Sequence, residues 1–188
     1  MLKIVVPSGE FFNERTDQFV YTKETTLQLE HSLVSVSKWE ATWKKPFIVY
    51  DQTQQNMTQE MVMDYIKQMT ITQNVDPNVY YALTQNNLKE IIEYIQDQKT
   101  ATWFSKKPQA GKRDTRPLTS ERIYYFMVHY NIPFECQKWH LSRLLTLIRV
   151  CQEEEAAENK ANKATPREAA LARHQAMAAR RAKSAKHH

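Results

Sequence analysis

Residues 132–151 read IPFECQKWHLSRLLTLIRVC and carry the most apolar helical pattern in the chain. Apolar residues at helical spacing form one stripe, which consists of Leu141, Leu144, Leu145, Ile148 and Cys151. Three further apolar residues lie beside this stripe and make the apolar face wider, namely Trp139, Leu147 and Val150. A helix that is apolar on most sides lies inside a fold. The stretch therefore predicts a central core helix over residues 136–152.

The same stretch contains a candidate chemical site. Cys136 and His140 are four residues apart, which on a helix puts both on one face, as a metal pair or a nucleophile and base would require. A closed zinc site needs two more ligands. His129 and Cys151 could supply them only if the fold brought both residues next to Cys136 and His140. Aromatic neighbours predict that Cys136 is buried, whereas an activated thiolate needs exposure. We therefore expect a packed thiol and a hydrogen-bonded histidine, with no metal and no cofactor.

Other catalytic patterns are weak. Glu90, Glu93 and Asp97 share a helix face, but that face lies opposite the apolar stripe and is explained by solvation. The chain has only two glycines, so glycine-rich nucleotide loops are excluded. The sequence predicts a protein without enzymatic activity.

Outward from the core helix, the periodicity predicts a mainly α protein of the α+β class. Alternation at residues 2–6, 18–21 and 25–30 predicts a small antiparallel β element. From residue 32 helical spacing takes over, with cap residues predicting helix starts at Thr58, Thr84 and Thr119 or the following serine. The predicted structural core comprises Trp39, Trp43, Ile92, Trp139, Leu144, Leu145 and Ile148.

Charge separates the end of the chain from its body. Residues 159–188 hold eight basic residues and one acidic residue, a net charge of +7, while the rest holds 18 basic and 20 acidic residues. The predicted domains are an N-terminal β element at 1–31, a helical core domain at 32–152, and a linker with a basic C-terminal tail at 153–188. The tail has few large apolar residues to dock it, so both a helical and a disordered state stay open.

The tail also carries the candidate partner-binding residues, namely Arg173, Arg180, Arg181 and Lys183. Their charge could engage phosphates, although the tail has no aromatic residue for base stacking. It could instead order on a partner protein, or serve only as a solubilising tail. A helix-turn-helix at 120–152 is disfavoured because its second helix exposes little polar surface.

The sequence predicts no membrane association. Its first ten residues contain a short apolar run, unlike a signal peptide, and no segment approaches the roughly 18 apolar residues of a membrane span. We therefore expect a cytoplasmic protein whose two cysteines are reduced.

Several strings, in this order, resemble one family. They are LEHSLVSVSKWEATWKKPF (29–47), DYIKQMTIT (64–72), VDPNVY (75–80), TATWFS (100–105) and IYYFMVHYNIPFECQKWHLSRLLTLIRVC (123–151). The family is that of the tail assembly chaperones of long-tailed, non-contractile bacteriophages. The resemblance covers about residues 25–151, and the tail shares only its basic, Arg- and Ala-rich character.

This resemblance implies an assembly factor without catalytic residues. Such proteins coat the phage tape measure protein, keep its apolar helices soluble, recruit tail tube subunits and leave before the tail is finished. The expected location is the host cytoplasm, not the mature virion, and in many such phages a frameshift yields a longer form. Exposed methionines at 57, 61, 63 and 69 would supply adaptable contacts, unless Met61 and Met69 belong to the core.

Two alternatives remain at this point. The +7 tail suits a small nucleic-acid-associated protein, and a minor structural virion protein is the other alternative. The sequence leaves the oligomeric state open.

Overall fold

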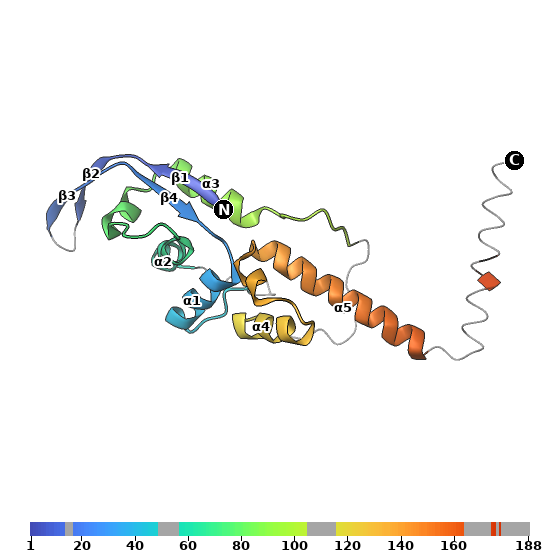
Figure 1. The fold of residues 1–188 in the computed structure, drawn as a ribbon. Helices are drawn as coiled ribbons and strands as arrows, with labels where there is room; N and C mark the ends of the chain where they lie inside the picture. Colours follow the sequence, from blue (N-terminus) through green and yellow to red (C-terminus); the bar gives the residue numbers. More distant parts are fainter. Residues whose placement is uncertain (14–16, 49–56, 105–115, 164–173, 176, 178–188) are drawn as a thin grey trace, which may run out of the picture. The chain divides into compact units, whose positions relative to one another are not determined.

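Four strands near the start of the chain form one long β-hairpin in two successive ladders (Figure 1). The structure is a computed structural model, which describes residues 1–13, 17–48, 57–104, 116–163, 174, 175 and 177. The first ladder pairs β1 (Leu2–Val6) with β4 (Thr25–Leu29), and the second pairs β2 (Gly9–Asn13) with β3 (Gln18–Thr22), both antiparallel. The predicted small antiparallel element is confirmed.

A single register runs through both ladders. Val6 pairs with Thr25 and Gly9 with Thr22, so two residues are skipped on each side between the ladders. Pro7 lies in the skipped segment, and a proline has no N–H to donate to a ladder. The sequence did not predict β2, because its adjacent pair of phenylalanines hides the alternation expected of a half-buried strand.

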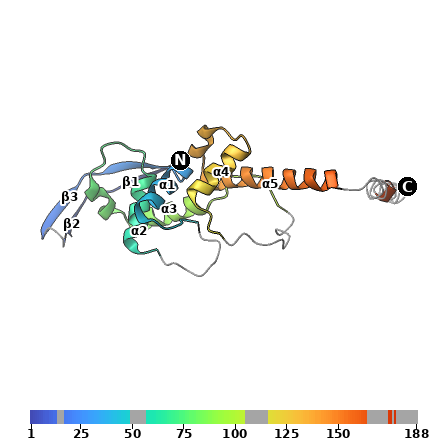
Figure 2. The same ribbon diagram turned by 90° about the horizontal axis from the view of Figure 1, so that it is seen from below.

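Helical segments make up most of the remainder, and the protein is mainly α-helical, as predicted. They are α1 (Leu33–Trp43), α2 (Gln59–Met69), η1 (Pro77–Ala82), α3 (Gln85–Gln96), α4 (Ser120–His129), η2 (Phe134–Lys138) and α5 (Leu141–Lys163). The predicted caps are correct in position, with Thr58, Thr84 and Thr119 each preceding its helix. α1, α2 and α3 gather beside β1 and β4 (Figure 1, Figure 2).

Two tryptophans fasten α1 to α2. The indole N–H of Trp39 donates to the backbone oxygen of Met61 at 3.0 Å, and that of Trp43 donates to a carboxylate oxygen of Asp64 at 2.9 Å. At the end of α2 the chain runs along β4, where Glu30 donates its backbone N–H to the oxygen of Met69 at 2.8 Å. The inner face of the first ladder is thereby joined to the helices in one core.

Six of the seven predicted core residues lie in the core or against it, and one does not. Trp39, Leu144 and Ile148 are buried, while the partly buried Trp43, Trp139 and Leu145 pack against the core.

Ile92 is the exception, since it is 52% exposed. The sequence pattern placed Leu88, Ile91, Ile92 and Ile95 on one apolar stripe of this helix. In the structure the buried residues of α3 are Asn87, Ile91 and Tyr94, while Leu88 and Ile95 are partly buried against the core. Asn87 determines this rotation, because its side chain caps the helix and its amide donates to the backbone oxygen of Val5 at 3.1 Å. Ile92 is consequently turned toward solvent.

The predicted helix at 136–152 also needs correction. Phe134–Lys138 is a separate 3₁₀ turn, Trp139 follows in an extended conformation, and α5 begins at Leu141. Cys136 and His140 therefore do not lie on one helix. Beyond the predicted end, α5 continues to Lys163, and its residues 152–159 are exposed. The sequence left open whether residues 153–163 form a solvent-exposed helix or a linker, and the structure has a helix there.

The chain divides into two compact units, Met1–Ile148 and Arg149–His188. The strands belong to the same unit as the helices, whereas the sequence placed a boundary between residues 31 and 32. The second boundary lies four residues before the predicted one. In the part of the chain described by the structure, no helix has the length and apolar character that a membrane crossing requires.

Candidate functional site

His140 and Cys136, the pair singled out by the sequence, serve packing and hydrogen bonding. Cys136 is a buried free thiol in η2. Both ring nitrogens of His140 have partners: Nε2 lies 2.9 Å from the backbone oxygen of Tyr94 and Nδ1 lies 2.8 Å from the hydroxyl of Ser142. The expected buried thiol and hydrogen-bonded histidine are confirmed.

The other predicted site residues contribute no assembled centre. Glu90, Glu93 and Asp97 are exposed, and Glu93 lies 3.9 Å from Lys89 in a surface ion pair. Within the described ranges, no three His, Cys, Asp or Glu side chains are grouped as a metal site would need. The candidate binding residues Arg173, Arg180, Arg181 and Lys183 lie outside the described residues.

A buried cluster of histidines and tyrosines lies where α1, α2, α3 and α5 converge. Nδ1 of His31 is 2.5 Å from the hydroxyl of Tyr65, which is 3.4 Å from the hydroxyl of Ser35. The His31 ring meets the His140 ring edge-on, with centroids 5.0 Å apart, and the ring of Tyr94 stands against His140 at the same distance. The cluster thus joins side chains from four separate parts of the sequence.

Burial shifts the titration of this cluster away from neutral pH. Desolvation, together with the nearby His140, lowers the pKa of His31 to about 4. Desolvation also lowers the pKa of His140 and raises the pKa of Tyr65 and of Tyr94. All four groups are neutral near pH 7, which suits a buried hydrogen-bonded network with no charge to offset.

Glu40 on α1 is a second buried polar group, only 7% exposed. One carboxylate oxygen accepts the backbone N–H of Phe47 at 2.7 Å, and the other accepts that of Ser120 at 2.7 Å. Ser120 begins α4, whose own cap residue Thr119 makes no side-chain cap bond. A carboxylate from α1 therefore satisfies an N–H in the first turn of α4, where the helix dipole favours negative charge.

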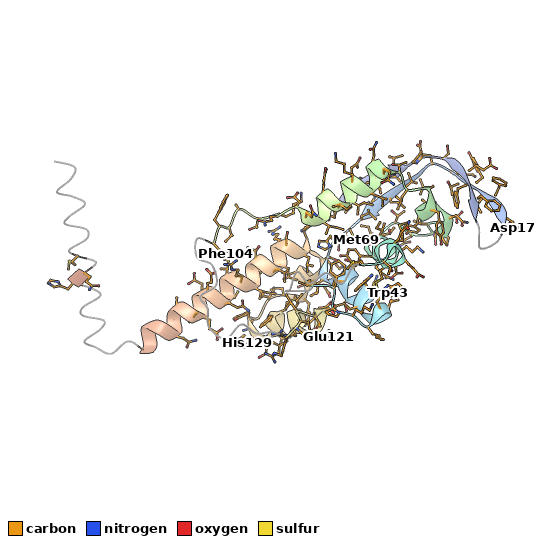
Figure 3. All side chains as sticks on the ribbon, turned by 180° about the vertical axis from the view of Figure 1, so that it is seen from behind. Asp17, Trp43, Met69, Phe104, Glu121 and His129 are labelled. Atoms are coloured by element: carbon orange, nitrogen blue, oxygen red, sulfur yellow. The ribbon has the colours of Figure 1, made fainter. Side chains whose placement is uncertain are left out.

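The outer face of the β2–β3 hairpin presents an aromatic surface. Phe12, Phe19 and Tyr21 share this face and are 47%, 72% and 66% exposed. Phe12 and Phe19 form a cross-strand edge-to-face pair with centroids 5.2 Å apart. The opposite face packs on η1, where Phe11 contacts Tyr81. Figure 3 shows the side chains of this hairpin, with Asp17 marking its tip.

We call Phe12, Phe19 and Tyr21 the aromatic face. Taking about 200 Å² for a whole aromatic side chain, the three expose roughly 400 Å² together. The largest apolar patches of monomeric proteins are of this size, about 300–600 Å², and are often functional. The aromatic face therefore has the dimensions of a binding surface.

Further exposed apolar side chains are scattered over the helices. Tyr125 and Val128 on α4, Ile92 on α3 and Trp103 after it are each more than half exposed. Of the methionines expected to make adaptable contacts, Met61 and Met69 are buried and Met63 is partly buried. The alternative assignment of Met61 and Met69 to the core is therefore correct.

A pocket of about 320 Å³ adjoins the aromatic face, since Tyr21 forms part of its wall. Lys23, residues 72–76 and Val79 also contribute to the wall. Small-molecule sites are typically enclosed and mostly apolar, with a few convergent polar groups. This pocket is open and lined largely by polar residues, so it does not resemble such a site.

Sequence reasoning missed both features, for different reasons. The aromatic face had a usable signal: adjacent phenylalanines at 11 and 12 must point to opposite faces of a strand, so one of them points away from the packed face. His31, Tyr65 and Tyr94 had none, because three single residues about 30 positions apart form no local pattern. Only tertiary packing brings them together.

Comparisons of the chain with protein-family models, curated proteins and solved structures found no match.

Proposed function

We propose that this chain is a tail assembly chaperone of a long-tailed bacteriophage. It binds apolar helices of the tape measure protein, keeps them soluble and promotes assembly of the tail tube, without catalysis. The observation that carries the proposal is the ordered set of tryptophan-centred strings within residues 25–151.

The positions of these strings are consistent with a fold shared between this chain and the tail assembly chaperones. Trp39 and Trp43 bond α1 to α2, and Trp139 packs against the core while the Arg143 guanidinium stacks on its ring at 4.2 Å. Residues that position elements are the ones expected to recur among proteins of similar architecture. The strings therefore support a likeness of fold, while the partner must be held by other residues.

The aromatic face supplies a physical basis for binding apolar helices. Aromatic side chains offer large contact areas at little cost in conformational entropy, and they dominate the energetics of protein interfaces. The face lies on a two-stranded ribbon supported on one side by η1. We assign it as the surface that contacts the partner.

Co-expression with the tape measure protein tests the function. A chaperone should raise the soluble fraction of the tape measure protein severalfold and co-elute with it on gel filtration. If its solubility is unchanged and no complex elutes, the proposed function is wrong.

A triple variant, with Phe12, Phe19 and Tyr21 each changed to serine, tests the assigned surface. It should reduce binding at least tenfold, because the three rings would form the centre of the contact. The matched control changes Trp103 and Tyr125 to serine, which removes exposed aromatic surface elsewhere. Equal losses in both variants would show that the aromatic face has no special role.

A nucleic-acid-associated protein is the second candidate, favoured by the +7 charge of residues 159–188. Binding to duplex DNA should then weaken steeply with salt and vanish when these residues are deleted. No gel retardation at low salt would exclude this candidate. A minor structural virion protein would instead be detected by mass spectrometry of purified particles, where an assembly chaperone should be absent.

A further inference from the structure

The buried histidine–tyrosine cluster takes no part in the proposed binding surface, yet it lies where the last core helix joins the fold. His31 precedes α1, Tyr65 belongs to α2, Tyr94 to α3, and His140 immediately precedes α5. All four are held by direct hydrogen bonds or ring contacts. The start of α5 is thus attached to three other elements through one set of side chains.

Three hydrogen bonds at this point fasten the start of α5. The backbone N–H of Leu141 donates to the oxygen of His31 at 2.9 Å, across 110 residues of sequence. Nε2 of His140 lies 2.9 Å from the backbone oxygen of Tyr94, and the backbone N–H of Lys99, just after α3, donates to the Ser142 hydroxyl at 3.3 Å. Displacing either histidine would therefore disturb these attachments together.

The hydrogen-bond partners define the protonation states. A carbonyl oxygen only accepts, so Nε2 of His140 carries a proton to donate to Tyr94. The Tyr65 hydroxyl lies 2.5 Å from Nδ1 of His31 and 3.4 Å from the Ser35 hydroxyl, whose own proton is donated to the backbone oxygen of Ser32. We therefore assign the Tyr65 proton to the shorter contact, with Nδ1 of His31 as the acceptor. His31 is therefore neutral and accepting in the closed cluster.

We infer that His31, Tyr65, Tyr94 and His140 form an acid-sensitive latch that fastens the first turns of α5 to the core, and that protonation of His31 opens it. A proton on Nδ1 turns the acceptor toward Tyr65 into a donor. It also places a positive charge in a site that is 4% exposed and faces Phe47, Tyr65 and His140. Opening hydrates the charged ring, so acid favours the open state.

Among the residues that the structure describes, no charged group acts as a counter-ion for His31, whose pKa is shifted by desolvation and by the nearby His140. Near His140, Asp97 raises its pKa, while Lys99 and the amino group of Met1 lower it. Lys99 is itself ion-paired with Asp97. Glu30 acts on Tyr94, whose pKa is raised. Desolvation is the first cause of the low pKa of His31 and the nearby His140 adds to it, so burial governs the response.

Hydrogen exchange of the full chain at pH 7.5 and pH 5.0, corrected for intrinsic exchange rates, tests the latch. Relative to pH 7.5, protection of the peptides covering residues 139–148 should be at least tenfold lower at pH 5.0. The exchange should occur through a local opening, so low urea concentrations should not accelerate it. For a histidine whose pKa changes from about 4 when buried to 6.5 when hydrated, linkage limits the loss to about 30-fold.

Two variants complete the test. His31→Gln keeps a neutral acceptor for Tyr65 and removes the titration of His31, so most of the loss of protection should disappear and only the smaller part due to His140 should remain. His129→Gln, at an exposed position on α4, should leave the loss unchanged. A wild-type loss below tenfold, or a full loss in H31Q, overturns the latch. If H31Q does not fold, the wild-type protein alone decides the test. Should its exchange at pH 5.0 be accelerated by low urea concentrations, the protection is lost through global unfolding and the latch is overturned.

Discussion

Glu40 shows how much one buried side chain can organise. Its carboxylate bonds the N–H of Phe47, just after α1, and the N–H of Ser120, 80 residues further along. Hydrogen bonds to charged groups contribute more than neutral ones, and an N–H left buried without a partner costs free energy. The residue therefore fixes the start of α4 against α1.

Replacing Glu40 with alanine should destabilise the protein by about 3 kcal/mol, because two backbone N–H groups lose a charged acceptor. Urea unfolding followed by tryptophan fluorescence measures the change. The control, Glu90→Ala at an exposed position of α3, should change the free energy of unfolding by less than about 0.5 kcal/mol. Similar values for both variants would mean that the Glu40 bonds add little.

His31 makes the stability of the whole fold depend on pH. Its pKa is about 4 in the folded protein and 6.5 when unfolded, so between these values the unfolded chain binds more protons. Stability should be complete above pH 6.5 and fall by about 3 kcal/mol as the pH drops to 4. The lowered pKa of His140 acts in the same direction.

Urea unfolding curves between pH 7.5 and pH 4 measure this dependence. In H31Q the curve of stability against pH should be flatter by most of that amount, while carboxylate titrations remain in both proteins. Parallel curves for the wild type and the variant would contradict the assignment. At the alkaline end, the raised pKa of Tyr65 and of Tyr94 means that stability is lost as the pH rises above 10.

At the scale of elements, the positions of the helices along the sequence were predictable, whereas the face that α3 turns toward the core was not. Local signals such as the caps at Thr58 and Thr84 define where a helix starts. The rotation of α3 depends instead on the bond from Asn87 to Val5, which a local pattern does not contain. The polar Asn87 is buried while the apolar Ile92 is exposed, the reverse of what hydrophobicity alone predicts.

Paired substitutions on α3 test this rotation. Ile91→Ala should cost about 3 kcal/mol in stability, since Ile91 is 2% exposed and the truncation leaves a cavity. Ile92→Ala should cost less than about 1 kcal/mol, because its side chain is half exposed. Thermal unfolding of both variants under one condition gives the comparison. The opposite order of costs would place Ile92, rather than Ile91, in the core.

At the scale of the molecule, every buried hydrophobic residue of the described chain lies at or before Ile148. A chain shortened to residues 1–152 should therefore unfold at the same temperature as the full chain, to within about 2 °C. Calorimetry of both proteins measures this. A drop of 5 °C or more would show that later residues contribute to the core.

The sequence predicted the α+β class, the strands β1, β3 and β4, and the burial of Trp39, Leu144 and Ile148, because each of these depends on local periodicity. It did not predict the break at Trp139, where an apolar pattern continues through a change of backbone conformation. The histidine cluster was missed because it depends on which elements pack together, whereas the aromatic face was missed although the adjacent phenylalanines at 11 and 12 carried a local signal.

The bond between His31 and Leu141 also bears on how the chain folds during synthesis. Contacts between distant positions form late, since the closing segment must first leave the ribosome. Until the start of α5 emerges, the core lacks the buried side chains of Leu141, Leu144 and Ile148. The nascent protein therefore lacks a complete core until residues 141–148 have left the ribosome, which happens only near the end of its synthesis.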